Sequence, residues 1–221
     1  MPLSAAQPRE LQHTRAITIH GYLREDGLYD IEAELVDTKT YGFPNHYRGY
    51  VAPGEKLHHM LLRLTINNDM EIVASEAATE AGPYPMCPQA APNFVRLQGL
   101  KIGKGFLRAA SERIGHTHGC THLRELLQQM ATTAFQTTFP TRVRREAEAA
   151  KKPLPAGDAY DTQVTEYFGG PPAVLNTCLA YADDGPLVQR RWPKFYKGPQ
   201  TGSHQTLSGG CCLIPGFGWC D

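Results

Sequence analysis

The sequence has no net charge and no region in which charge of one sign is concentrated. Its 22 lysines and arginines balance 22 aspartates and glutamates over 221 residues, and the basic residues are scattered. A nucleic-acid-binding face requires a basic patch or stripe. Nucleic acid is therefore not an expected partner.

Long hydrophobic runs are also missing. No apolar stretch approaches the ~20 residues that a membrane-spanning helix needs, and residues 1–8 lack the basic start and apolar run of a secretory signal. A composition of 41% hydrophobic and 20% charged residues is that of a globular chain. We expect a cytoplasmic protein without a membrane partner, and the sequence leaves its oligomeric state open.

Only six cysteines occur in the chain. Because reducing systems keep cytoplasmic thiols reduced, we expect thiols, metal ligands or nucleophiles rather than disulfides. Three of the six lie in a Gly-rich C-terminal segment, and the others are Cys87, Cys120 and Cys178.

The first 80 residues predict strands, and the following residues predict helices. Apolar and polar residues alternate around 17–19, 31–35 and 62–66, and the turn signals 24–27 (Arg-Glu-Asp-Gly) and 67–69 (Asn-Asn-Asp) predict two hairpins. Helical spacing covers residues 106–114 and a longer stretch that starts near Thr121, which we expect to end before Pro140. A separate solvated helix is expected over 141–152, and helical spacing near Val174 predicts a closing element that returns to the core with Cys178.

These elements predict an α+β fold, with an antiparallel sheet of about four strands packed by C-terminal helices. The composition changes to Gln, Thr, Gly, Ser and His beyond Gly198. We therefore expect a single domain over residues 1–198 and a Cys- and Gly-rich tail over 199–221.

The densest chemical cluster precedes the long helix. Residues 115–122 read Gly-His-Thr-His-Gly-Cys-Thr-His, with three histidines and one thiol. Imidazole and thiolate suit zinc, iron or copper, and a helix N-terminus stabilises the thiolate of Cys120. His122 is placed either to share a metal with Cys120 or to accept its proton. His118 is a further candidate ligand, although such clusters also occur without metal.

A tetrahedral site needs ligands from a second segment, because neighbouring residues on a short segment point in different directions. Cys87 is the candidate, since the prolines of 83–88 (Pro-Tyr-Pro-Met-Cys-Pro) hold it where the strands lead into the helices. Asp37 lies at a strand end and is a further residue that could reach a site. For His58 and His59 a structural role is the expected one.

Several strings of residues carry a resemblance to a known family. The most specific is 119–123 (Gly-Cys-Thr-His-Leu), and the others are 9–15, 24–32, 37–39, 83–87, 125–127 and 131–136. Residues 3–197 thereby resemble a proteobacterial family known only as a domain of unknown function. The resemblance implies no activity, and its motif residues correspond to Cys87, Cys120 and His122. The order Cys87, Cys120, Cys178 is also similar to the layout of iron–sulfur scaffold proteins.

Three functional hypotheses follow. The first is a metal-dependent or activated-thiol enzyme of lyase or hydrolase type, acting on a small molecule through Cys120, His122, Cys87 and His118 with zinc or iron as the metal. The second is a metal or iron–sulfur carrier, and whether the protein is an enzyme therefore stays open. The third is a precursor of a ribosomally made, modified peptide, because Gly209-Gly210 followed by residues 211–221 resembles a leader end and a Cys-rich core.

Overall fold

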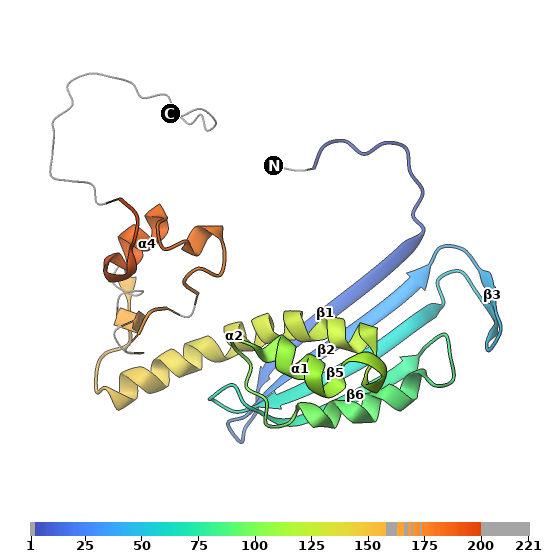
Figure 1. Ribbon diagram of the computed structural model, residues 1–221, viewed down its shortest axis with the longest axis horizontal. Helices are drawn as coiled ribbons and strands as arrows, with labels where there is room; N and C mark the ends of the chain where they lie inside the picture. Colours follow the sequence, from blue (N-terminus) through green and yellow to red (C-terminus); the bar gives the residue numbers. More distant parts are fainter. Residues whose placement is uncertain (1–2, 158–162, 166–167, 169, 173, 200–221) are drawn as a thin grey trace. The chain divides into compact units, whose positions relative to one another are not determined.

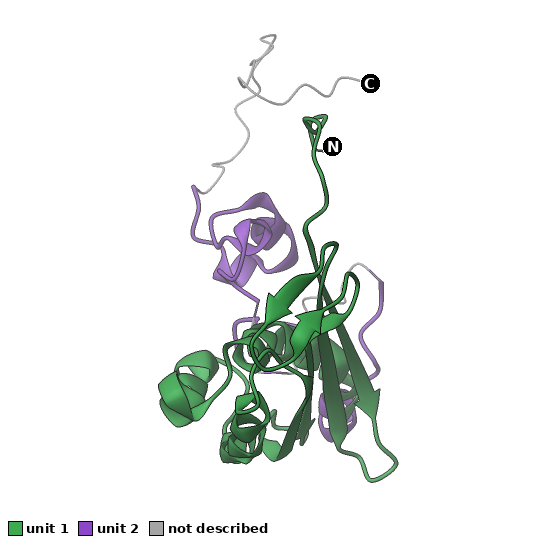
Figure 2. Cartoon of the chain, turned by 90° about the vertical axis from the view of Figure 1, so that its right-hand side faces the viewer, with its two compact units in different colours: residues 1–145 green, residues 146–221 purple. Residues whose placement is uncertain are grey.

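The structure is a computed structural model that describes residues 3–157, 163–165, 168, 170–172 and 174–199. The chain divides into two compact units, residues 1–145 and 146–221 (Figure 2). The predicted boundary near residue 198 stays a prediction, because residues 200–221 lie outside the described part of the chain. The peptide segment 211–221 lies outside it as well.

The first unit is built on a four-stranded antiparallel sheet in the order β1-β2-β5-β6 (Figure 1). The strands are β1 (His13–Leu23), β2 (Tyr29–Lys39), β5 (Lys56–Ile66) and β6 (Ile72–Ala81). Both predicted hairpin turns are present: Gly27 has a φ of 82° in the first, and in the second the Asn67 side chain accepts hydrogen bonds from the backbone of Asp69 and Glu71. The α+β prediction and its two hairpins are confirmed.

The segment between β2 and β5 holds a second, two-stranded sheet. Its strands β3 (Phe43–Asn45) and β4 (Gly49–Val51) pair antiparallel. These strands were not expected from the sequence, because the segment is rich in turn-forming residues. The chain enters the small sheet from the C-terminal end of β2 and returns from it to the N-terminal end of β5.

Helices cover one face of the main sheet (Figures 1 and 2). They are the 3-10 helices η1 (Cys87–Leu97) and η2 (His116–His118) and the α-helices α1 (Phe106–Ile114) and α2 (Thr121–Ala149). The core joins the inward residues of β2, β5 and β6 to Phe94, Phe106 and the predicted stripe of α2, which consists of Leu123, Leu126, Leu127, Met130 and Ala134. Burial of this apolar face is what fixes the start of α2 above the sheet.

The prediction that the long helix ends before Pro140 is wrong. α2 continues through Pro140 to Ala149 and absorbs the separate helix expected over 141–152. Pro140 lies on the exposed side of the helix, where water can satisfy the carbonyl that loses its N–H partner. The buried Thr138 hydroxyl donates to the carbonyl of Ala134, one turn back. Packing on the buried side of the helix, where Thr138 lies, keeps the helix continuous.

The second unit contains the short elements η4 (Leu179–Tyr181), α4 (Pro186–Arg191) and η5 (Pro193–Phe195). Val188 and Trp192 are buried, and the expected return of this segment to the core stays a prediction. The helix predicted near Val174 is wrong. Asn176 adopts a left-handed φ of 59° and bonds Asp183, which breaks the helical path. Cys178 is consequently exposed rather than buried in a core, and Leu179 is 94% exposed.

Among the described residues, no helix combines the length and apolar character needed to cross a membrane.

Candidate metal centre

The apolar inner face of the sheet is bordered at one end by a row of three polar residues, Arg15, Asp37 and His58. The buried positions of β2 alternate as Tyr29, Ile31, Ala33, Leu35 and then Asp37. On β5 the inward residues Ile66, Leu64, Leu62 and Met60 lead in the same way to His58. The strand register pairs Arg15 of β1 with Asp37, and Asp37 with His58. Three neighbouring strands therefore place polar side chains side by side where the helices cover the sheet.

The pairing of β2 with β5 becomes irregular at this row. Asp37 pairs with His58, whereas the next residue, Thr38, pairs with Lys56, so that Leu57 is an extra residue on β5. Such bulges change the direction in which neighbouring side chains point. The irregularity coincides with the change from apolar to charged inner residues.

Asp37 is the centre of the row, and its residue is 1% exposed. Arg15 binds it in a bidentate manner, with Nε 2.8 Å from Oδ1 and Nη2 2.8 Å from Oδ2. His13 Nε2 lies 3.1 Å from Oδ1, and His58 Nδ1 lies 2.9 Å from Oδ2. Because an ionised carboxylate only accepts hydrogen bonds, both imidazoles donate. These four donors use the lone pairs of both oxygens.

The electrostatics of Asp37 favour its charged form. Burial by itself would raise the pKa of the carboxyl, but the hydrogen bonds and charge of Arg15, together with His13 and His58, outweigh burial and hold the pKa well below its usual range. Asp37 is thus ionised at neutral pH.

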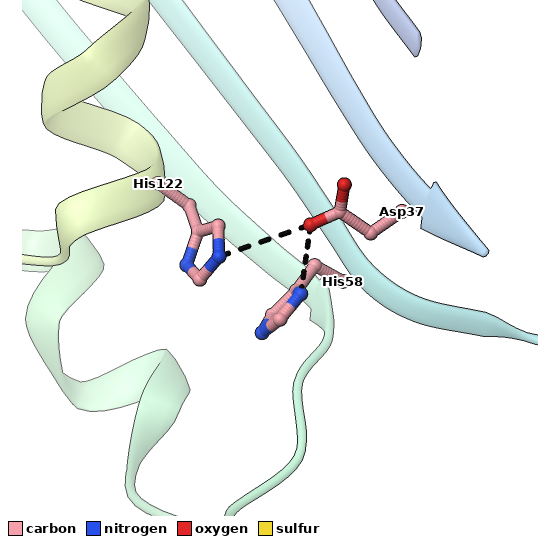
Figure 3. A group of neighbouring side chains, drawn as sticks. All are labelled: Asp37, His58 and His122. Atoms are coloured by element: carbon pink, nitrogen blue, oxygen red, sulfur yellow. Dashed lines mark hydrogen bonds and ion pairs between the residues drawn. The ribbon is translucent and has the colours of Figure 1, made fainter. Parts of the chain in front are cut away.

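His122 reaches the same carboxylate from the first turn of α2 (Figure 3). Its neighbour Leu123 is fully buried and fixes the rotation of the helix. His122 Nε2 lies 3.8 Å from Asp37 Oδ2, and its ring stacks on that of His58 with a centroid separation of 3.8 Å. The two rings and the carboxylate meet from three different elements.

Both histidines are held in the neutral state. Burial lowers the pKa of His58, and the adjacent His122 lowers it further. Burial also lowers the pKa of His122, followed by the charge of Arg15. Neutral imidazole is the form that binds metals.

Two further residues frame the site on α2. Glu125 lies one turn after His122, and its Oε2 is 2.6 Å from Arg15 Nη1, which ties the helix to β1. Cys120 directly precedes α2, and its carbonyl accepts from the N–H of Arg124 as an N-cap residue does. Its Sγ lies 3.9 Å from His122 Nδ1, on the opposite side of the ring from Asp37.

The arrangement suits a small cation. Asp37, His58 and His122 each offer a ligand atom within 4.8 Å of the others. Ligands at about 2.1 Å around a tetrahedral zinc ion lie about 3.4 Å from one another, and the separations of 2.9 Å and 3.8 Å from Asp37 Oδ2 bracket that value. Two histidines and one carboxylate leave coordination positions open for water or substrate.

The structure brings together only part of the residue set chosen from the sequence. His122 belongs to the three-residue group, and Cys120 contacts His122 from behind. Cys87 packs beside Gly82 at the end of β6, while His118 is exposed and its carbonyl accepts from the Asn93 side chain. Within the described part of the chain, the group contains neither of these two residues and no cysteine.

His13, Arg15, His58 and Glu125 were not identified as site residues from the sequence, and Asp37 was only a marginal candidate. The sequence carries a usable signal for Asp37 and His58. Asp37 and His58 both continue an alternating apolar series by two residues, and a charged residue in phase with a core face needs a partner there.

The site lies within the part of the chain that matches a known protein family. A family model described as "Protein of unknown function (DUF2889)" matches residues 13–136. This range runs from the first residue of β1 into α2 and includes all the residues of the site described above. No curated protein and no solved structure matches the chain significantly.

Proposed function

The chain belongs to this family of unknown function, DUF2889, and because the family description carries no activity we propose a function from the site itself. The expected resemblance to a domain of unknown function is confirmed over residues 13–136, whereas its extent over 3–197 and its proteobacterial origin stay predictions. The protein is a metal-dependent enzyme of hydrolase or lyase type in which Asp37, His58 and His122 bind a divalent ion such as zinc or iron. The convergence of these three ligand groups from β2, β5 and α2 carries the proposal.

The charges of the site support metal binding over a purely structural network. If the network were only structural, one cation would be enough to compensate the charge of the buried Asp37 carboxylate, and Arg15 already supplies that cation. Two neutral imidazoles beside the same oxygen add little Coulombic stabilisation, but they supply nitrogen ligands for zinc or iron. A bound ion would polarise a substrate carbonyl or activate a water molecule.

Binding has a defined proton balance. His58 Nδ1 donates its proton to Asp37 Oδ2, so an ion held by these two atoms would require the other neutral tautomer of His58, with the proton on Nε2. No proton is released to solvent at neutral pH, and metal affinity rises with pH only in the acid range, where protonation of the histidines competes with the ion.

The test is metal content and calorimetric titration of the full-length protein with Zn²⁺ and Fe²⁺. We expect one ion per chain and at least ten-fold weaker binding in His58→Ala. His59→Ala is the matched control, because His59 is the adjacent residue, faces the other side of the sheet and pairs with Glu34 at 2.7 Å. Equal loss in both variants, or no binding by the wild type, would refute the proposal.

A second function is favoured by the position of Cys120. The series Cys120 Sγ, His122 and Asp37 has separations of 3.9 Å and 3.8 Å and follows the order of nucleophile, base and orienting acid. On this alternative, Cys120 attacks an electrophilic carbon without a metal. It predicts that His122→Gln slows alkylation of Cys120 by iodoacetamide while a chelator leaves the rate unchanged. Chelator-accelerated labelling would instead support the metal site.

The carrier and the peptide-precursor hypotheses stay predictions. The described three-residue group contains no cysteine, so it gives an iron–sulfur carrier no support. Intact mass spectrometry of protein from the native host tests the peptide precursor, since cleavage or modification would change the mass.

A further inference from the structure

Arg15 is fixed by one partner and presents its remaining end to another. Its Nε and Nη2 are held by Asp37 at 2.8 Å each. Its Nη1 points to Glu125 Oε2 at 2.6 Å. The Arg15 side chain is 32% exposed and that of Glu125 is 46% exposed, whereas Asp37 is buried. One side of the guanidinium is therefore structural, and the other lies at the surface beside the metal ligands.

We propose that Arg15 is the carboxylate-binding residue of the site, and that the carboxylate of a substrate takes the place of Glu125 on Nη1. The inference rests on the proposed metal site and names its substrate class: a small carboxylate with a second oxygen within reach of the ion. Glu125 occupies the position in the absence of substrate.

The distances match a single small molecule. Nη2 lies 2.8 Å from Asp37 Oδ2, and an ion bound to that oxygen lies about 2.1 Å from it. Nη2 and the ion are thus at most about 5 Å apart, and Nη1, the nitrogen that would bind the substrate, is at most about 7 Å from the ion. A 2-hydroxy or 2-oxo carboxylate spans this distance when one carboxylate oxygen accepts from Nη1 and its neighbouring oxygen group contacts the ion.

The energetics allow the exchange. Both partners of the Arg15–Glu125 pair reach solvent, and exposed ion pairs are weak because water and salt screen them. Arg15 loses no further side-chain freedom when a new anion arrives, since Asp37 already orients its guanidinium. An incoming carboxylate makes the same charge-assisted hydrogen bonds as Glu125.

The rest of the sheet offers a matched comparison. Arg63 also lies between two carboxylates, with Glu32 at 2.7 Å and Glu76 at 3.3 Å. It lies on the opposite face of the sheet from Asp37, since its strand positions are out of phase with His58. No metal-ligand group adjoins Arg63 among the described residues. Glu76→Gln is therefore the matched control: it changes the net charge of the protein by the same amount as Glu125→Gln, but at a position away from the site.

The experiment uses ¹⁵N NMR of the arginine side chains in the full-length protein, with the Arg15 signal assigned by its loss in Arg15→Lys. Acetate, with acetamide as its neutral counterpart and inorganic phosphate as a second anion, is titrated into metal-free wild type, Glu125→Gln and Glu76→Gln. We expect acetate alone to shift the Arg15 signal strongly, and to bind roughly two- to five-fold more tightly to Glu125→Gln, since removing an exposed pair frees the site. Glu76→Gln should match the wild type.

A second titration uses glycolate with the Zn²⁺-loaded protein, where a hydroxyl beside the carboxylate adds an ion contact. We expect glycolate to bind at least ten-fold more tightly than acetate, and Arg15→Lys to remove most of this gain. Absence of an Arg15 shift with acetate, equal tightening in both Gln variants, or stronger binding of phosphate overturns the inference. Failure of Zn²⁺ to bind refutes the metal site itself, and the metal-free titration still decides whether Arg15 binds carboxylates.

Discussion

Replacement of Asp37 by asparagine tests the electrostatic account of the site most directly. Asn has the shape of Asp but lacks its charge, and it places an amide NH₂ where one carboxylate oxygen now accepts. If the amide oxygen keeps the side of Arg15 Nε and His13, the NH₂ group faces Arg15 Nη2 and His58 Nδ1, both of which now donate to Oδ2. His58 can change tautomer, but Arg15 Nη2 cannot.

The expected cost follows from burial. Removing one partner of a buried ion pair costs about 3–5 kcal/mol, and a hydrogen bond to a charged group contributes about 1.5–3 kcal/mol. Asp37 is buried, but the Arg15 side chain is 32% exposed and can regain water. We therefore expect Asp37→Asn to lower the free energy of unfolding of the metal-free first unit by about 2–3 kcal/mol at pH 7.

The same reasoning fixes the pH dependence. The pKa of Asp37 in the folded protein is below its usual value, so its stabilisation is complete above the unfolded pKa of about 3.9. That stabilisation is lost as the pH falls from about 4 toward the lower folded pKa. The difference in stability between wild type and Asp37→Asn should shrink over this range, because asparagine does not titrate.

The assay has to report on the first unit. Both tryptophans, Trp192 and Trp219, belong to the second unit, so tryptophan fluorescence is unsuitable. Hydrogen exchange of the amides of β2 measures the relevant opening free energy. Glu34→Gln is the control on the same strand, since Glu34 is exposed and faces away from the core. Equal stability of wild type and Asp37→Asn at pH 7, or a difference that is as large at pH 3 as at pH 7, would refute the reasoning.

Three further predictions concern packing and accessibility. Gly21→Ala should lower the stability of the first unit by about 1–3 kcal/mol, because its new methyl overlaps Thr137 of α2, and Thr137→Ala should recover part of the loss by chemical denaturation. Pro140→Ala should raise stability by about 1–2 kcal/mol in the same assay, since it restores a helical hydrogen bond at an exposed position; a loss would contradict the continuous helix. In metal-loaded protein, the exposed Cys178 should react with iodoacetamide faster than the half-buried Cys120, and peptide mapping that finds the reverse order would argue against the structure.

The sheet was predictable because its signals are local. Alternation and an Asp-Gly turn specify a hairpin within a few residues, and the register of β1 with β2 follows from the turn. The end of α2 depends on a non-local balance instead. Pro140 is a helix breaker by itself, yet it lies on the exposed side of a helix whose other side is packed, including the buried Thr138. The sequence does not show which side of the helix is covered.

The site was only partly predictable for a related reason. His122 was found because its neighbours in the sequence were chemically dense, but His118 was chosen on the same criterion and lies outside the three-residue group. Cys87, chosen because prolines hold it where the strands lead into the helices, lies outside the group as well. His58 was judged structural because it stands beside His59 in a strand. The strand period separates these two: counting back by twos from Met60 reaches His58, the inward residue, and leaves His59 to pair with Glu34.

The inner face of the sheet links the stability of the fold to the geometry of the site. A slip of one residue between β2 and β5 would turn either Leu35 or Met60 outward, and it would also separate Asp37 from His58. The apolar residues that make such a slip costly therefore hold the two ligand groups in register as well. His122 is placed in the same way, because burial of Leu123 fixes the rotation of α2. In the contact between Arg15 and Glu125 both side chains reach solvent, and it is accordingly the contact that a substrate can replace without disturbing the core.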